Sequence, residues 1–437
     1  MSSGATVWGP VSWLMRFDSR YSGGALVEQF ELEFKLRNNS TLGVLSREIF
    51  SINFSAFEFQ QLMISKFKGI FFTASRQKSP NSPSNLPPLP YLKPFSTSQI
   101  LGTKMESEAP APTLLLLAGK SNEEKDVAKI LQDNNTLQLH KNGEQVEVVL
   151  HSQVQTPFKD DEFRVEEYFY SLSTTRFGRL LIYSPKLSST HDVISQNNSD
   201  LPVGSVCVAD VQLKGRGRTS NVWLSPKGCL LFSFSIQMED GRMVPHLQYV
   251  VCLAMTEAIK AICVEKGTPH LDVRIKWPND LYLGGLKVGG ILSTSVYRSK
   301  KFYISAGVGL NVGNEKPTTC LNAVLKRVNP LSRELKREDI IAAFFNKFES
   351  FYDVFLEQGF QALEELYYTT WLHSGQRVIV QDRSDDQDQL VENVVTIQGL
   401  TSSGYLLAIT DDGQMCELHP DGNSFDFFKG LIKRKLS

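Results

Sequence analysis

The 437-residue chain lacks the patterns that mark several common classes of protein. Its six cysteines include no C-x-x-C pair, and most of them stand among apolar residues, where a free thiol behaves as a small hydrophobic side chain. No histidine and cysteine cluster has the spacing of a zinc site. The sequence therefore favours a reducing compartment and argues against a resident transition metal.

An excess of one charge and a long apolar run are absent as well. The chain has 46 basic and 47 acidic residues, so no net field draws it onto nucleic acid or an anionic membrane. No plain apolar run, such as TLLLLA at Thr113, approaches the roughly 20 residues that cross a bilayer. We therefore expect a soluble protein that binds neither DNA nor a membrane.

Acidic residues are missing throughout residues 59–104, where basic residues alternate with Ser and Pro. This composition is typical of an organellar transit peptide, although a disordered linker is also rich in Ser and Pro. We predict that residues 1–104 form a poorly structured extension that directs the protein to a chloroplast or mitochondrion. Met63 and Met105 are alternative starts, and a start at Met105 would give a cytosolic form.

Globular patterning begins after this extension. Residues 105–165 read as a small α/β region with a linker, in which Ser121 and Glu124 form a capping box ahead of a helix. Strands and helices mix across residues 167–368. Residues 371–437 contain short strands and turns with little helix, which predicts a small C-terminal β-barrel. The expected fold class is therefore α+β.

Familiar phosphate and nucleophile motifs are also missing. AGKS at Ala118 follows a strand, but Leu114 occupies the place of the first glycine of a P-loop. GVGLNVG, which starts at Gly307, has Val312 where a dinucleotide fingerprint needs its third glycine. No Gly-x-Ser-x-Gly elbow occurs. Neither glycine motif therefore supports a nucleotide fold.

The stretch VADVQLKGRGRTSNVWLSPKG, at residues 208–228, sets Lys214, Arg216 and Arg218 among glycines. Guanidinium groups bind carboxylates or phosphates through two hydrogen bonds, and glycine lets such a loop close over a ligand and exclude water. An Arg-Gly run is also common in RNA-binding segments. Because the run stands between two expected strands, GSVCVAD and GCLLFSFSI, we interpret it as an anion clamp.

A second element is RIKWPNDLYLGGLKVGGIL. Pro278 ends a strand, Asn279 and Asp280 turn the chain and offer oxygens, and Lys287 follows a Gly-Gly turn of the kind that hairpins favour. Side-chain-free positions such as Gly290 let a ligand approach the backbone. A surface hairpin with an exposed lysine fits the same residues.

The third element is KLSSTHDVISQN. Ser188, Ser189 or Thr190 could cap a short helix and leave polar groups for a ligand, although capping alone explains most such runs. His191 could act as a base, but no partner at ligand spacing supports a metal site.

These elements, together with GVGLNV, resemble the biotin protein ligase family, also called holocarboxylase synthetases, in its eukaryotic, plant-type form. The resemblance covers residues 181–311 and rests on GRGRTSNVW, KWPNDLYL, LKVGGIL and GVGLNV. It implies a mixed sheet with helices and a C-terminal SH3-like barrel. It also implies that biotin and ATP give biotinyl-5'-AMP, whose acyl group passes to a lysine on a biotin carboxyl carrier domain of acetyl-CoA carboxylase or a related carboxylase.

The resemblance also implies roles for individual residues. It implies biotin contacts for Ser189, Thr190, His191, Gln212, Arg216, Gly217, Arg218, Lys287, Gly290 and Ile291. It implies ATP or adenylate contacts for Trp223, Asn279, Asp280 and Asn311. Lys287, Arg218 and Arg216 are the expected catalytic cations, and Asp280 is the candidate ligand for Mg²⁺.

Departures from the family and rival functions stay open at this point. His191 stands where bacterial members have Asn, and Asn221 replaces a basic residue of the bacterial loop. No helix-turn-helix precedes the catalytic region, so repressor activity is not expected. The rivals are a lipoate ligase, an Arg-Gly RNA-binding protein and a non-catalytic biotin sensor.

Overall fold

A computed structural model describes most of the chain. The described residues are 11–22, 25–38, 41–51, 113–139, 146–154, 161–218, 221–314, 316–383, 390–419, 423–426 and 429–434. The expected targeting segment at 59–104 and the alternative starts at Met63 and Met105 lie outside them. The described residues divide into two units, one within residues 1–105 and one within residues 106–437.

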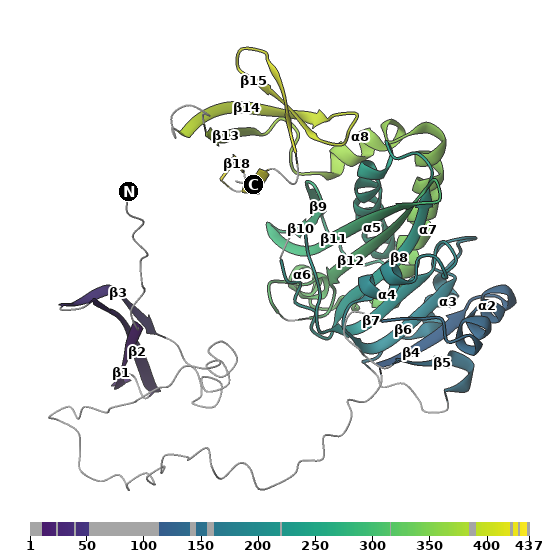
Figure 1. The fold of residues 1–437 in the computed structure, drawn as a ribbon, viewed down its shortest axis with the longest axis horizontal. Helices are drawn as coiled ribbons and strands as arrows, with labels where there is room; N and C mark the ends of the chain where they lie inside the picture. The colour runs from purple at the N-terminus through teal and green to yellow at the C-terminus, as the bar shows by residue number, and fades with distance from the viewer. Residues whose placement is uncertain are drawn as a thin grey trace, which may run out of the picture. The chain divides into compact units, whose positions relative to one another are not determined.

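The first unit contains an antiparallel sheet in the order β1-β2-β3 (Figure 1). Its strands are β1 (Val11–Ser22), β2 (Ala25–Asn38) and β3 (Thr41–Ser51). This sheet differs from the poorly structured extension expected there. In β2 the apolar residues Phe30, Leu32, Phe34 and Leu36 alternate with polar and charged ones, which is the strand pattern that the sequence interpretation overlooked.

The second unit is built on a mixed nine-stranded sheet in the order β5-β4-β6-β7-β8-β12-β11-β10-β9 (Figure 1). Its strands are β4 (Thr113–Gly119), β5 (Val146–Leu150), β6 (Leu180–Leu187), β7 (Val206–Gln212), β8 (Cys229–Met238), β9 (Val273–Lys276), β10 (Asp280–Leu283), β11 (Leu286–Arg298) and β12 (Lys301–Asn311). β4 pairs with β5 and β6 with β7 in parallel, whereas β7 to β12 pair antiparallel. The predicted α+β class is confirmed.

The expected α/β region at 105–165 shares this sheet, because β4 pairs directly with β6. Its helix α2 (Asn122–Asp133) begins with the predicted capping box, in which Glu124 Oε2 accepts the N–H of Ser121 at 2.8 Å. Lys120 of AGKS donates to the carbonyl of Phe169 at 2.7 Å. This lysine therefore ties the end of β4 to a segment 49 residues further along the chain.

The remaining helices pack on the sheet. They are α3 (Val165–Ser171), α4 (Thr190–Gln196), α5 (Val244–Glu265), α6 (Leu321–Val328), α7 (Arg337–Gln358) and α8 (Gln361–Thr370). Alternate residues of β8 point to opposite faces. Phe234 packs on Phe348 of α7 with ring centroids 5.0 Å apart, while Ser233 bonds Thr190 of α4. Helices α4 and α7 therefore lie on opposite faces of the sheet.

Helix α5 is long and apolar enough to cross a membrane by length and composition alone. Polar residues interrupt its apolar ones, so no plain apolar run in the sequence marks this property. However, 72% of its most apolar window is buried within the protein, and residues such as Tyr249 and Leu253 are fully covered. This burial is the property of a core helix.

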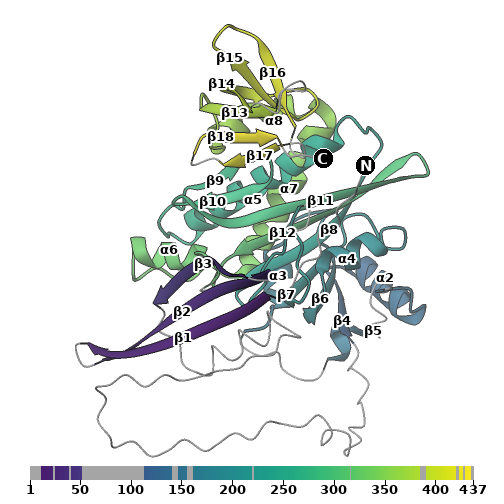
Figure 2. The same ribbon diagram turned by 60° about the vertical axis from the view of Figure 1, so that its left-hand side comes forward.

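The C-terminal residues form a six-stranded sheet in the order β16-β15-β14-β13-β18-β17 (Figure 2). Its strands are β13 (Arg377–Arg383), β14 (Leu390–Leu400), β15 (Leu406–Thr410), β16 (Met415–Leu418), β17 (Asn423–Asp426) and β18 (Leu431–Arg434). A register shift between Ile397 and Gly399 interrupts the regular pairing of β14. The predicted C-terminal β domain is confirmed.

Candidate functional site

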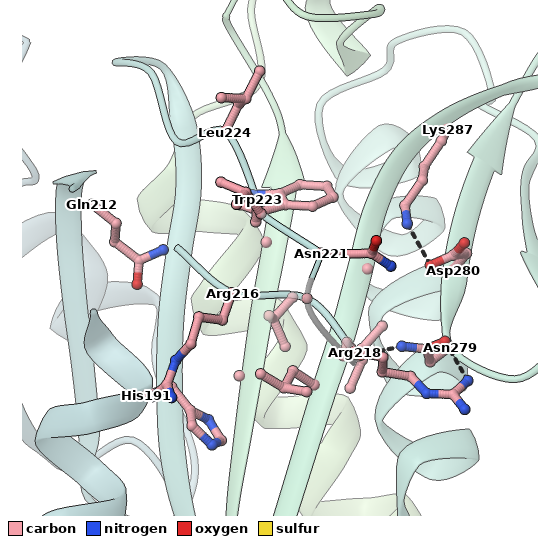
Figure 3. A pocket seen from close by; sticks show the side chains of 18 of the residues that line it. His191, Gln212, Arg216, Arg218, Asn221, Trp223, Leu224, Asn279, Asp280 and Lys287 are labelled. Carbon is pink, nitrogen blue, oxygen red and sulfur yellow. Dashed lines mark hydrogen bonds and ion pairs between the residues drawn. The ribbon is translucent and has the colours of Figure 1, made fainter. Parts of the chain in front are cut away.

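A cavity of about 550 Å³ opens on the α4 side of the sheet (Figure 3). All the residues to which the sequence interpretation assigned ligand contacts line it: Ser189, Thr190, His191, Gln212, Arg216, Gly217, Arg218, Trp223, Asn279, Asp280, Lys287, Gly290, Ile291 and Asn311. The structure therefore brings together segments more than a hundred residues apart in the sequence.

The start of α4 forms one wall. Ser189, one of the three candidates, is its N-cap residue, although its side chain makes no capping hydrogen bond. The N–H of Thr190 donates to Gln212 Oε1 at 2.8 Å, and its hydroxyl lies 2.8 Å from Ser233 Oγ. His191 Nε2 lies 2.9 Å from the hydroxyl of Thr294 on β11. These contacts hold a set of buried polar groups at this end of the cavity.

The cationic loop closes on itself next to that wall. The N–H of Trp223 donates to the carbonyl of Gly215 at 3.0 Å, and the N–H of Gly217 donates to that of Asn221 at 2.9 Å. A Cβ at position 215 would lie 2.5 Å from the Trp223 carbonyl oxygen, so only glycine fits there. The described residues 215–217 and 221–223 are therefore paired with each other.

The two arginines of the loop point in different directions (Figure 3). Arg216 extends toward α4 and forms an ion pair with Asp192. Arg218 extends to the opposite side, where its Nη1 lies 3.4 Å from Asn279 Oδ1. The cations that the sequence interpretation grouped as one clamp thus reach two separate parts of the site.

Lys287 and Asp280 lie together on the opposite wall. Lys287 Nζ is 2.6 Å from Asp280 Oδ1 and 5.5 Å from the centroid of the Trp223 ring, which is cation–π distance. The pairing of β10 with β11 skips Val288, because Leu281 faces Gly289 while Tyr282 faces Lys287. Such a bulge re-aims the neighbouring side chains, and here it places Lys287 on the face of Gly290.

The floor consists of β12. A Cβ at Gly309 would lie 2.6 Å from Trp223 Nε1, so the indole ring rests directly on the glycine backbone. Trp223 Nε1 is buried and has no hydrogen-bond partner among the described residues. Asn311 is fixed differently, because its Nδ2 donates to the carbonyl of Thr319 at 3.1 Å. The indole N–H of Trp223 is therefore covered by the backbone of β12.

Positive charge dominates the lining. Among the described residues that line the cavity, Arg216, Arg218, Lys276 and Lys287 face a single carboxylate, that of Asp280. No group of three His, Cys, Asp or Glu side chains that could hold a metal ion occurs in the described part of the chain. The cavity is suited to anions, and any cation in it would need oxygens from the ligand as well.

Several lining residues escaped the sequence interpretation. Lys276 stands in the KWPND motif, close to Asn279 and Asp280. The alternation of Phe and Ser along β8 could have pointed to Ser233. No sequence signal marks Asp192 as the partner of Arg216, because that pairing depends on how α4 packs against the loop.

Two family models match the chain. The Biotin/lipoate A/B protein ligase family matches residues 183–311, which hold most of the cavity lining. The Biotin protein ligase C terminal domain matches residues 373–430, which correspond to the C-terminal sheet.

Close relatives match most of the chain. Biotin--protein ligase 1, chloroplastic, from Arabidopsis thaliana is 62% identical over 79% of this chain and 94% of the relative. Biotin--protein ligase 2 from the same plant is 65% identical over 74% of this chain and 98% of the relative. Among solved structures, a mutant biotin protein ligase from Aquifex aeolicus in complex with biotin is 26% identical with a TM-score of 0.43, over 55% of this chain and 94% of that chain.

Proposed function

The chain belongs to the biotin–protein ligase family, and from this premise we propose that its cavity joins biotin to ATP and then delivers the biotinyl group to a protein lysine. In the first step a carboxylate oxygen of biotin attacks the α-phosphorus of ATP, and pyrophosphate leaves. In the second step the lysine ε-amine attacks the acyl carbon, loses a proton and releases AMP. The observation that carries the proposal is the cationic cavity that the predicted residues line.

The cations of the cavity supply the positive charge that the first step needs. A carboxylate and a triphosphate repel each other, and placed cations stabilise the charge that develops as they react. Lys287 stands beside Gly290, where a ligand can approach the backbone of β11. Arg218 reaches the same side from the loop. We assign Lys287 and Arg218 to the reacting carboxylate and phosphate.

Asp280 changes partners in this proposal. Without ligand its carboxylate neutralises Lys287. An anionic ligand would compete with Asp280 for the ammonium group, and the Asp280 carboxylate would then be able to hold Mg²⁺, because Mg²⁺ in nucleotide sites takes one or two carboxylates together with phosphates and waters. The ion would neutralise negative charge on the phosphates. Asp280 would hold it, with Asn279 as the neighbouring oxygen donor.

The polar wall at α4 would bind the ring system of biotin through Ser189, Thr190 and His191, and the apolar stretch at Ile291 would pack on its hydrocarbon chain. Trp223 and Asn311 lie toward the other end, where the adenylate would sit.

The assay that tests the proposal is biotin-dependent exchange of labelled pyrophosphate into ATP by the full chain, followed by transfer of labelled biotin to a biotin carboxyl carrier domain of acetyl-CoA carboxylase. We expect both activities. Lipoate in place of biotin provides the matched control, because the family model also includes lipoate ligases. Exchange that depends on lipoate alone, or no exchange with either acid, would contradict the proposal.

A plastid destination is a second part of the proposal. It is supported by the acid-free composition of residues 59–104 and by the relative described as chloroplastic. Residues 1–104 fused to a fluorescent protein should enter isolated chloroplasts and be shortened there. Import into mitochondria alone would contradict the plastid destination, and a fusion that starts at Met105 should stay outside both organelles.

A further inference from the structure

The ion pair between Arg216 and Asp192 links the cationic loop to helix α4. The exposed fraction of the Asp192 side chain is only 15%, against 44% for Arg216. Asp192 stands in the first turn of α4, directly after Thr190 and His191, which line the cavity. The pair therefore joins the covering loop to the wall assigned to biotin.

Backbone hydrogen bonds hold the base of the cationic loop. The N–H of Leu213 donates to the carbonyl of Leu187 at 3.0 Å, and that of Lys214 donates to the carbonyl of Ser188 at 2.8 Å. These bonds fix the point where the chain leaves β7. Arg216 lies further out, where its backbone forms a bridge to Val222 within the loop itself. Its side chain reaches α4 at Asp192 and so ties this outer part to the wall.

We propose that Asp192 is a positioning residue, which holds Arg216 against α4 so that the loop covers bound biotin and its adenylate. The inference rests on the proposed function and concerns the same site. Asp192 does not line the cavity, whereas Arg216 does, so Asp192 acts through the arginine. The pair serves retention of the ligands, while the chemistry depends on Lys287 and Arg218 at the opposite wall.

A different role for Asp192 makes the opposite prediction. If Asp192 merely neutralised an arginine that otherwise binds the biotin carboxylate, its removal would free Arg216 and tighten biotin binding. Under the positioning role its removal releases the loop and weakens binding. The direction of the change in KM for biotin therefore separates the two.

The test is Asp192→Asn in the full chain, which removes the charge and keeps the size of the side chain. We expect the KM for biotin in pyrophosphate exchange to rise about 5- to 10-fold, as for a partly exposed charge-assisted hydrogen bond. The kcat at saturating biotin should change less than twofold, and free biotinyl-5'-AMP should appear in solution. Asp192→Glu should restore part of the retention. Asp200→Asn, an exposed acid that follows the same helix, is the matched control.

Arg216→Gln completes a double-mutant cycle. If Asp192 acts through Arg216, adding Asp192→Asn to Arg216→Gln should have little further effect. Additive losses, an unchanged KM in Asp192→Asn, or a lower KM would overturn the inference. A wild-type chain without exchange activity would instead overturn the proposed function, so the two failures are distinct.

Discussion

At the scale of single residues, the site balances its own charges before any ligand arrives. Lys287 is paired with Asp280 and Arg216 with Asp192, so two of the cavity's cations already have internal carboxylate partners. An anionic ligand must therefore compete with a carboxylate at each of them. The effect on ligand binding of removing one of these cations therefore depends on the carboxylate that is left without its partner.

Replacement of Lys287 by Ala should abolish most of the adenylation step. The change removes the charge assigned to the carboxylate and phosphate and leaves Asp280 as an uncompensated anion where anions must bind. Loss of one group that stabilises developing charge typically costs about 10²- to 10³-fold in kcat, and we expect a loss of that size in pyrophosphate exchange. Lys260→Ala, which removes a lysine paired with Glu257 on α5, provides the control. Exchange within threefold of wild type in Lys287→Ala would refute the assigned role.

Replacement of Arg218 by Ala should act on retention as well as on rate. Its guanidinium bridges the loop to Asn279, so its loss removes a cation and a contact that holds the loop near the reacting groups. We expect a higher KM for biotin and release of free adenylate, measured as labelled biotinyl-5'-AMP that a filter does not retain. Normal biotin affinity without release would contradict a clamp role for Arg218.

At the scale of elements, the Gly-Gly pair predicted the hairpin of β10 and β11. Gly284 and Gly285 both adopt positive φ, at 58° and 78°, which is the conformation that such a turn requires. The sequence could not predict the bulge at Val288, since nothing in a hydrophobic run shows which residue a partner strand will skip. The bulge nevertheless decides which face Lys287 occupies. The motif thus pointed to residues that line the cavity, while their geometry depends on strand pairing.

The close contact of β12 with Trp223 gives a prediction for this element. Gly309→Ala would place a Cβ about 2.6 Å from the indole nitrogen, so the ring must leave the floor of the cavity. We expect the KM for ATP to rise about tenfold or more, because the ring is assigned to the adenylate. Overpacking that displaces a side chain typically costs on the order of 1–3 kcal/mol, and here that free energy would be lost from ATP binding. Gly313→Ala is the matched control, because its nearest neighbour would be 3.8 Å away. Equal kinetics for the two variants would exclude a role for Trp223 on the floor.

At the scale of the whole molecule, the C-terminal domain bonds directly to the turn that carries the site. The backbone N–H of Trp277 donates to His373 Nε2 at 2.9 Å, and the N–H of Leu372 donates to the carbonyl of Ile275 at 2.9 Å. Tyr249 of α5 bonds both Trp277 and Gly404. Composition predicted the C-terminal domain, but these contacts join residues too distant in the sequence for any local pattern to reveal.

His373 should make the stability of this assembly depend on pH. Burial lowers the pKa of His373 from 6.5 to about 4, with repulsion from Lys276 adding to the shift and the hydrogen bond to Gln376 opposing it. Since Nε2 accepts from the Trp277 backbone, the imidazole must be neutral in the folded state. Above pH 6.5 the imidazole of His373 is neutral in both the folded and the unfolded chain, so it does not change the free energy of unfolding. As the pH falls from 6.5 toward 4, only the unfolded chain gains the proton, so the free energy of unfolding should drop by up to about 3 kcal/mol.

Urea unfolding of the full chain at pH 7 and pH 5 would measure this slope, and His373→Gln is the decisive variant, because its amide oxygen can replace Nε2 as an acceptor but cannot titrate. Burial also lowers the pKa of His246, which adds a slope of the same sign in both proteins. We therefore expect the variant to lose only part of the wild-type dependence, while its unfolding free energy at pH 7 stays close to that of wild type. If the free energy of unfolding depended equally on pH in the two proteins, His373 would have the same pKa in the folded and the unfolded chain. The hydrogen bond from the Trp277 N–H would then not hold His373 neutral, which would contradict the link between the C-terminal domain and the site.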